Sequence, residues 1–125
     1  MTEAELKART KSFGLRVIRL VETLPASRTS NVIANQLLRS STSVGANYRA
    51  ACRGRSAAEF VAKLGVVEEE ADESCYWLEM LRDANLVKAA LLTDILREAN
   101  EITAIMAASR KTMIRNRKSQ IGIQK

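Results

Sequence analysis

Apolar residues recur at steps of three and four along most of the chain, and a single proline, Pro25, interrupts the pattern. This spacing is typical of helices that bury one face. Alanine, leucine, arginine, glutamate and lysine are plentiful, and these residues have the highest helix propensities. The 125 residues are enough to bury one core without disulfides or metals. The sequence therefore predicts an all-α protein of one domain.

Start and stop signals place the first two predicted helices. Thr2 and Glu5 have the spacing of a capping box, and the helix that follows ends before Pro25. Ser30 is expected to cap the second helix, because an apolar stripe begins directly after it. Gly54 is expected to end that helix.

The third predicted helix carries the most regular apolar stripe of the chain. Ser56 and Glu59 form a second capping box, and heptad spacing follows over residues 57–84. A fourth helix follows a short link, and residues 119–125 are expected to be a basic, disordered tail. Four long helices with short links predict an antiparallel up-down-up-down four-helix bundle over residues 1–118.

The sequence contains no histidine, which excludes several kinds of site. Glu-x-x-His metal pairs, Ser-His-Asp triads and histidine-ligated zinc are all impossible. Cys52 and Cys75 lack metal-type spacing and fit buried thiols in a reducing compartment, so we expect a cytoplasmic protein without a cofactor. No apolar run is long enough to span a bilayer, so no membrane partner is expected.

One enzymatic interpretation remains, and it rests on carboxylates. Glu69, Glu70 and Glu73 match the Glu-Glu-x-x-Glu half-motif of all-helical, magnesium-dependent nucleotide pyrophosphatases. That family also needs a following Glu-x-x-Asp, which the sequence lacks. A function without catalysis is therefore favoured.

Charge is distributed unevenly along the chain. Residues 25–55 contain five arginines and no acid, whereas residues 56–88 contain eight acids and three basic residues. The C-terminal stretch is basic again. Candidate nucleic-acid-binding residues are Arg49, Arg53, Arg55, Arg110, Lys111, Arg115, Arg117 and Lys118. The alternatives are a solvated basic end and a tail that serves solubility.

Antiparallel pairing of the second and third helices predicts which of their residues meet. Arg39 should lie level with Glu70 and about one turn from Glu73, which predicts a structural ion pair of buried groups. Gly45 and Gly65 should lie at one height, which predicts a close approach of the two backbones. The hydroxyls of residues 40–43 would need partners there, and the acids of the third helix could supply them.

Apolar residues outside the heptad stripe suggest an interface between subunits. Val61, Val66, Tyr76 and Trp77 exceed what one bundle interior needs, and the two adjacent aromatics cannot both face the same core. The alternative is a partly exposed aromatic residue in a monomer.

Two stretches resemble a known family. Residues 35–49 read NQLLRSSTSVGANYR, and residues 60–78 carry Phe60-x-x-Lys63-Leu64 followed by Glu70-Ala71-x-Glu73-x-x-Tyr76-Trp77-Leu78. Both are similar to the four-helix-bundle family named for proteins encoded in 23S rRNA intervening sequences.

The resemblance implies a bundle that assembles into a ring, commonly a pentamer, with no established enzymatic activity. A more distant relative, the accessory variability protein of diversity-generating retroelements, is a basic pentameric barrel that binds nucleic acid and a reverse transcriptase. We therefore expect a homo-oligomeric bundle that binds RNA or DNA, or serves as a scaffold, with a nucleic-acid-processing protein as a further partner. The alternative is a purely structural protein–protein interaction module.

Overall fold

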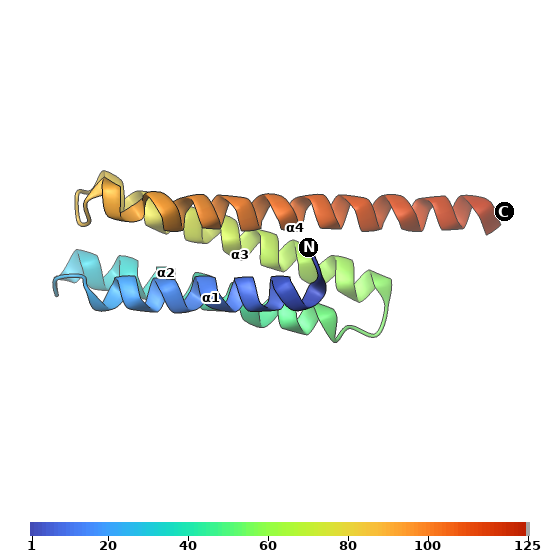
Figure 1. Cartoon of the computed structure of the whole chain (residues 1–125), viewed down its shortest axis with the longest axis horizontal. Coiled ribbons are helices and arrows are strands. Elements are labelled where there is room, and N and C mark those ends of the chain that lie inside the picture. The colour runs from blue at the N-terminus through green and yellow to red at the C-terminus, as the bar shows by residue number, and fades with distance from the viewer. Residues whose placement is uncertain (125) are drawn as a thin grey trace.

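The computed structural model describes residues 1–124 and contains four helices in this range. Helix α1 spans Glu3–Glu22, α2 Arg28–Cys52, α3 Ala57–Asp83 and α4 Ala89–Gln124. The α1–α2 and α3–α4 links lie at one end of the molecule, and the α2–α3 turn lies at the other (Figure 1). The predicted all-α four-helix bundle is confirmed.

Both predicted capping boxes lie at helix starts, but only one is complete. The Thr2 hydroxyl accepts a hydrogen bond from the Glu5 backbone nitrogen at 3.1 Å, and the Glu5 carboxylate accepts one from the Thr2 nitrogen at 3.2 Å. At α3, the Ser56 hydroxyl accepts from the Glu59 nitrogen, but the Glu59 carboxylate accepts from the nitrogen of Arg55 at 2.6 Å. Glu59 therefore fastens the α2–α3 turn to the first turn of α3.

Helix α2 begins earlier than its sequence suggested. Ser27 is the cap, and its hydroxyl accepts a hydrogen bond from the backbone nitrogen of Ser30 at 3.1 Å. Ser30, the predicted cap, is buried inside the first turn. Both serines offer the same hydroxyl, and the helix starts at the one nearer to Pro25 because nothing between them opposes helical backbone.

Helix α4 continues to Gln124, past residue 118, where the sequence predicted the end of the bundle. No proline follows residue 118, and the single glycine there, Gly122, weakens a helix by only about 1 kcal/mol. Residue 125 lies outside the described residues. Within residues 1–124, no helix combines the length and the hydropathy that crossing a membrane requires.

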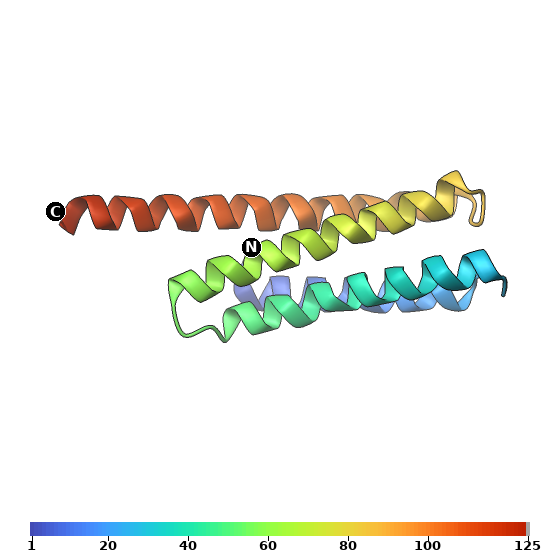
Figure 2. The ribbon, with the colours of Figure 1, turned by 180° about the vertical axis from the view of Figure 1, so that it is seen from behind.

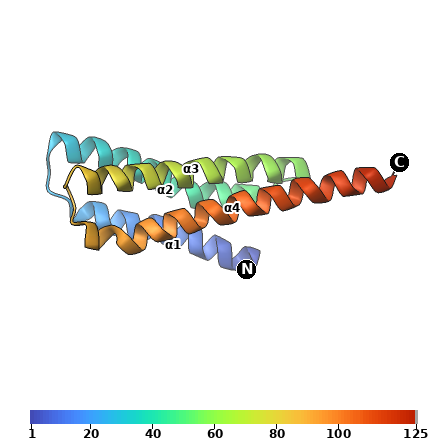
Figure 3. The same cartoon turned by 90° about the horizontal axis from the view of Figure 1, so that it is seen from above.

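Helix α3 lies between α2 and α4 and packs along both of them (Figure 2). Helix α1 packs mainly against α2 and touches α4 only slightly. The C-terminal part of α4 extends beyond the other three helices (Figure 3). The core is mostly aliphatic, and the rings of Phe13 and Tyr48 are buried in it. Its fully buried large apolar side chains are Phe13, Val17, Leu37, Val44, Leu64, Val67, Leu78, Leu81, Leu92, Ile102 and Met106.

The close approach of backbones involves α1 and α2, so the predicted pairing of Gly45 with Gly65 is wrong. A Cβ atom on Gly45 would lie 3.3 Å from the backbone nitrogen of Lys11 in α1. Gly14 approaches α2 in the same way, 3.5 Å from a backbone oxygen. Gly65 faces α4 instead, and its nearest neighbour is the flexible side chain of Arg110 at 3.7 Å. The sequence pattern did not predict the helix face on which each glycine lies.

The hydroxyls of residues 40–43 find partners without the acids of α3. Ser40 accepts a hydrogen bond from Ser74 at 3.0 Å, in the buried seam between α2 and α3. The other three donate to carbonyl groups one turn earlier in their own helix, as Thr42 does to Leu38 at 2.6 Å. The expected hydroxyl–carboxylate contacts are therefore absent among the described residues.

The two glycines should respond to substitution in opposite directions. Gly65→Ala should raise the free energy of unfolding by about 0.5–1 kcal/mol, because the helix gains propensity and only a mobile side chain lies nearby. Gly45→Leu should lower it by about 1–3 kcal/mol, because the side chain would meet the backbone of α1. Urea denaturation followed by circular dichroism at fixed protein concentration measures both changes. Equal effects at the two positions would contradict the assignment of the close approach to α1 and α2.

Candidate nucleic-acid interface

The topology brings two separate basic segments to the same end of the bundle. The α2–α3 turn, the N-terminus of α1 and the C-terminal part of α4 all lie at this end (Figure 1). In an antiparallel four-helix bundle the second and fourth helices run in the same direction, so their C-termini share an end. We call the exposed basic residues of the turn and of α4 beyond residue 110 the basic end.

The turn contributes the three arginines that the sequence singled out. Arg49, Arg53 and Arg55 are all exposed, and none of them forms an ion pair within the described part of the chain. Arg53 caps α2, and its backbone nitrogen donates to the last turn. Tyr48 is only 3 % exposed, so it is a core residue and offers no ring to stack on a base. Burial also raises the pKa of its phenol.

Arg110 is the one predicted contact residue that forms an ion pair within the described part of the chain. Its Nε and Nη2 atoms donate to the same oxygen of Glu68, at 3.1 and 3.0 Å. This ion pair is partly buried and joins α3 to α4. Arg110 therefore leaves the set of candidate contact residues, because its charge is already neutralised by a partner that the register of α3 and α4 places opposite it.

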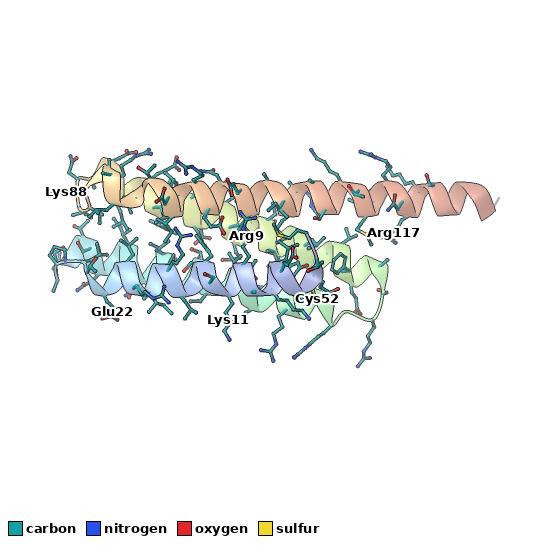
Figure 4. The ribbon with its side chains drawn as sticks, in the orientation of Figure 1. Arg9, Lys11, Glu22, Cys52, Lys88 and Arg117 are labelled. Carbon is teal, nitrogen blue, oxygen red and sulfur yellow. The ribbon has the colours of Figure 1, made fainter. Side chains whose placement is uncertain are left out.

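The other four candidate residues of α4 are exposed. These are Lys111, Arg115, Arg117 and Lys118. Arg117 lies well beyond the N-terminus of α1 (Figure 4). The same view places Lys88 at the opposite end of the molecule.

A shallow pocket of about 340 Å³ beside the α2–α3 turn adds a residue that sequence reasoning missed. Small apolar side chains form much of its lining, and Arg53, Arg55 and Lys63 contribute basic groups to it. Glu59 lies at the same pocket, with one carboxylate oxygen bound to the backbone of the turn. Lys63 went unnoticed because it stands in the acidic segment. Its position in the second turn of α3, close to the cap, could have indicated that it lies beside the arginines of the α2–α3 turn.

Arg39 contacts both predicted glutamates, but the group is more exposed than predicted. Arg39 Nη1 lies 3.1 Å from a Glu70 oxygen, and its Nη2 donates to Glu73. Trp77 donates its ring N–H to the same Glu73 oxygen at 3.0 Å. The Arg39 side chain is 48 % exposed, because the pair lies on the rim of the α2–α3 seam and not within it.

The carboxylates of the pyrophosphatase half-motif do not converge on one point. Arg39 engages Glu70 and Glu73, whereas Glu69 makes no ion pair among the described residues and lies on the exposed face of α3. In the described part of the chain, no three carboxylate or thiol groups are arranged to hold a metal ion. A magnesium site would need Arg39 to give up both of its partners.

A second ion pair, unpredicted from the sequence, joins α1 to α4. Arg9 donates to both oxygens of Glu98, at 2.8 and 2.6 Å, and also to Glu101 at 2.6 Å. These hydrogen bonds lower the pKa of Glu98 and raise that of Arg9. Figure 4 shows Arg9 between the two helices. No sequence motif marks this contact, because its partners are far apart in the chain and belong to two helices that touch only slightly.

Both cysteines are free, as expected, but only one is fully buried. Cys75 lies in the α3–α4 seam, where its sulfur contacts Asn100 at 3.5 Å. Cys52 is partly buried near the end of α2. Burial raises the pKa of both thiols, so neither is an activated nucleophile.

The predicted interface residues of α3 divide into two groups. Val61 and Trp77 are partly buried, and Trp77 packs against the core. Val66 is 36 % exposed and Tyr76 is 53 % exposed. The rings of Tyr76 and Trp77 meet edge to face, with centroids 4.9 Å apart. Tyr76 is therefore the aromatic that faces outward.

The geometry defines a small helical-bundle protein with a basic end. Its sequence matches the 23S rRNA-intervening sequence protein family over residues 2–108, and the chain belongs to that family. The predicted resemblance is thus confirmed. No curated protein matches the sequence.

A solved structure supports the same assignment. It is the crystal structure of a protein of unknown function from the S23 ribosomal protein family of Bacteroides thetaiotaomicron VPI-5482. The two sequences are 32% identical, and the match covers 89% of this chain and 99% of the other, with a TM-score of 0.82.

Removing Arg9 should destabilise the protein more than removing Arg39. Arg9→Ala breaks partly buried hydrogen bonds to charged groups, and we expect a loss of about 1–2 kcal/mol. Arg39→Ala should cost less, because water replaces its exposed contacts. The midpoint temperatures of thermal unfolding show which of the two variants is the less stable. An Arg39 variant that is the less stable of the two would contradict it.

The contribution of Glu98 should disappear in acid. Because its folded-state pKa is lowered, the stabilisation is complete above the unfolded value of about 4.3 and is lost as pH falls through the folded value. The difference in stability between wild type and Arg9→Ala should therefore shrink below about pH 4. Urea denaturation at a series of pH values measures it, and a gap that persists at the lowest pH would contradict the assignment.

Proposed function

We propose that this protein is a non-enzymatic homo-oligomeric bundle that binds the phosphate backbone of RNA or DNA through its basic end. The observation that supports this most directly is the gathering of exposed cations from two distant segments at one end of the molecule. They are Arg49, Arg53, Arg55, Lys111, Arg115, Arg117 and Lys118, with Lys63 beside them. Clustered cations of this kind bind polyanions by releasing their counterions.

Recognition of base sequence should be slight. Reading base edges or stacking on bases requires aromatic or bidentate groups held in a fixed geometry. Tyr48 is buried, and Phe60 packs against the core. The described residues of the basic end thus offer charge and hydrogen-bond donors but no exposed ring, which suits phosphate contacts.

Assembly would multiply this surface. One copy offers a modest number of cations, and a ring of copies, most simply a pentamer as the family resemblance implies, would repeat the basic end around one rim. Several ends that act on one polyanion raise the effective concentration of contacts. A nucleic-acid-processing protein is the further partner that the more distant retroelement resemblance suggests, and the cytoplasm is the compartment that fits two free thiols.

A scaffold function is the second candidate, and one observation favours it. The outward face of α3 combines exposed apolar residues with acids, which is unsuited to nucleic acid and suited to a protein partner. The two functions are compatible, because they use different surfaces.

Replacing the turn arginines should weaken binding without unfolding the protein. The Arg49→Ala, Arg53→Ala, Arg55→Ala variant should bind a labelled RNA or duplex DNA at least tenfold more weakly at low salt, because three phosphate contacts are lost. The slope of log affinity against log salt should fall by about 0.7–0.9 for each contact removed. Fluorescence anisotropy over a salt series measures both quantities.

The exposed cations of α4 should act together with those of the turn. Alanine at Lys111, Arg115, Arg117 and Lys118 should weaken nucleic-acid binding as strongly as the three turn substitutions do. Arg110→Ala should mainly lower the stability of the fold, because it breaks the ion pair with Glu68.

A matched control removes the same charge from the opposite end. The Arg19→Ala, Arg28→Ala, Lys88→Ala variant should keep nearly all of the affinity, since these residues lie beside the other links. If the control variant loses as much affinity as the turn variant does, binding depends on the net charge of the protein and not on the basic end. If wild type shifts neither nucleic acid at low salt and high protein concentration, only the scaffold function remains.

A further inference from the structure

Two apolar surfaces of this protein carry opposite charge. The first is a groove of about 340 Å³ between α1 and α2, which we call the α1/α2 groove. Leu15 and Ile18 line it from α1 and are 43 % and 38 % exposed. Lys7, Lys11 and Arg49 are its charged residues, and no acid lines it.

The groove follows from the packing of α1 on α2. Gly14 and Gly45 let the two backbones approach closely, and Gly45 itself lines the floor. Thr42 and Ala46, its neighbours on α2, are too short to cover the apolar side chains of α1. Two adjoining apolar side chains, Leu15 and Ile18, are left open in this way, and apolar patches on a surface often mark contact sites.

The second surface is the outward face of α3, which we call the α3 face. Val66 and Tyr76 are its exposed apolar residues. Glu69, Asp72 and Glu79 are exposed on the same stretch of α3, and none of these three acids forms an ion pair among the described residues. Val66 lies at the basic margin of this face, because it also lines the pocket that Arg53, Arg55 and Lys63 line. No basic residue occurs between positions 66 and 80.

One copy of the chain cannot join its own two surfaces. Helices α1 and α3 do not pack against each other, and α2 separates the groove from the α3 face. Lys11 extends from the edge of α1 away from α4 (Figure 4). We propose that the α1/α2 groove of one copy receives the α3 face of a second copy, with Lys7 and Lys11 meeting Glu69 and Asp72 around an apolar centre of Leu15, Ile18, Val66 and Tyr76.

Such a contact joins two different surfaces, so it is heterologous. Repetition closes a ring or continues as a filament, and it does not stop at a two-fold dimer. Complementary charge fixes which surfaces pair, while the apolar centre supplies most of the stabilisation. This inference rests on the assembly part of the proposed function. Arg49 belongs to both the groove and the basic end, but the proposed contact uses Lys7 and Lys11, which are outside the basic end.

Charge reversal tests the pairing. The groove variant Lys7→Glu, Lys11→Glu and the face variant Glu69→Lys, Asp72→Lys should each dissociate to the mass of one chain, because like charges then meet in every contact. A chain that carries all four substitutions should regain the wild-type mass. Multi-angle light scattering and native mass spectrometry measure this on nuclease-treated protein at micromolar concentration, and circular dichroism verifies that each variant is folded.

Mixing the two variants gives an independent readout. Each variant then offers a groove that matches the face of the other, so an equimolar mixture should form assemblies that contain both chains. A control variant, Arg28→Glu, Lys88→Glu, reverses two charges at the far end of the bundle and should keep the wild-type mass.

The outcomes separate this inference from the proposed function. A wild-type monomer overturns the assembly and the pairing together. A wild-type oligomer that both reversal variants preserve overturns the pairing alone, as does a folded four-substitution chain that stays monomeric. Failure to bind RNA or DNA, with these masses as expected, removes the nucleic-acid proposal and leaves the pairing intact.

Discussion

Helix α3 is the element on which the bundle depends, because it makes the two most extensive helix contacts, with α2 and with α4, and these two helices do not pack on each other. Its heptad stripe supplies Leu64, Val67, Leu78 and Leu81 to the core, all fully buried. Helix α2 and helix α4 meet through this stripe. Helix α1 is attached from the side, by its packing on α2 and by the ion pair of Arg9 with α4. The stability of α1 therefore rests on fewer apolar contacts and on one charged contact that spans an otherwise thin seam.

The sequence was informative wherever the determining residues are close together in the chain. Capping by Thr2 depends only on the residue three positions later in the chain. The Arg39 contact could be predicted by counting residues along both helices from the α2–α3 turn. Contacts that cross the bundle were less predictable. The pattern of a helix does not say which neighbouring helix each residue faces, so Gly45 was assigned to a contact with α3 and Arg110 to the candidate nucleic-acid contacts. The same limit hid Arg9, whose partners lie in the last helix.

The charge segregation along the sequence acquires a spatial meaning in the fold. Basic α2 and acidic α3 are neighbours, yet only Arg39 joins them by ion pairs in the described residues. Most of their charge points outward instead, which leaves one side of the molecule acidic and the turn basic. An evenly mixed surface would have served solubility equally well. Separated charge of this kind creates an electric field that can orient a charged partner before contact.

The extension of α4 past the bundle has a consequence for local stability. Up to Arg110 the helix is held by apolar contacts and by the pair with Glu68, but residues 115–119 are exposed on every side. Their backbone hydrogen bonds are then sustained by helix propensity alone, which is marginal for a few turns. Amide exchange along α4 should therefore be graded, slow in the core and fast past the last tertiary contact. The extension can lose its structure without unfolding the domain, so a polyanion that neutralises its cations would also act as its structural support.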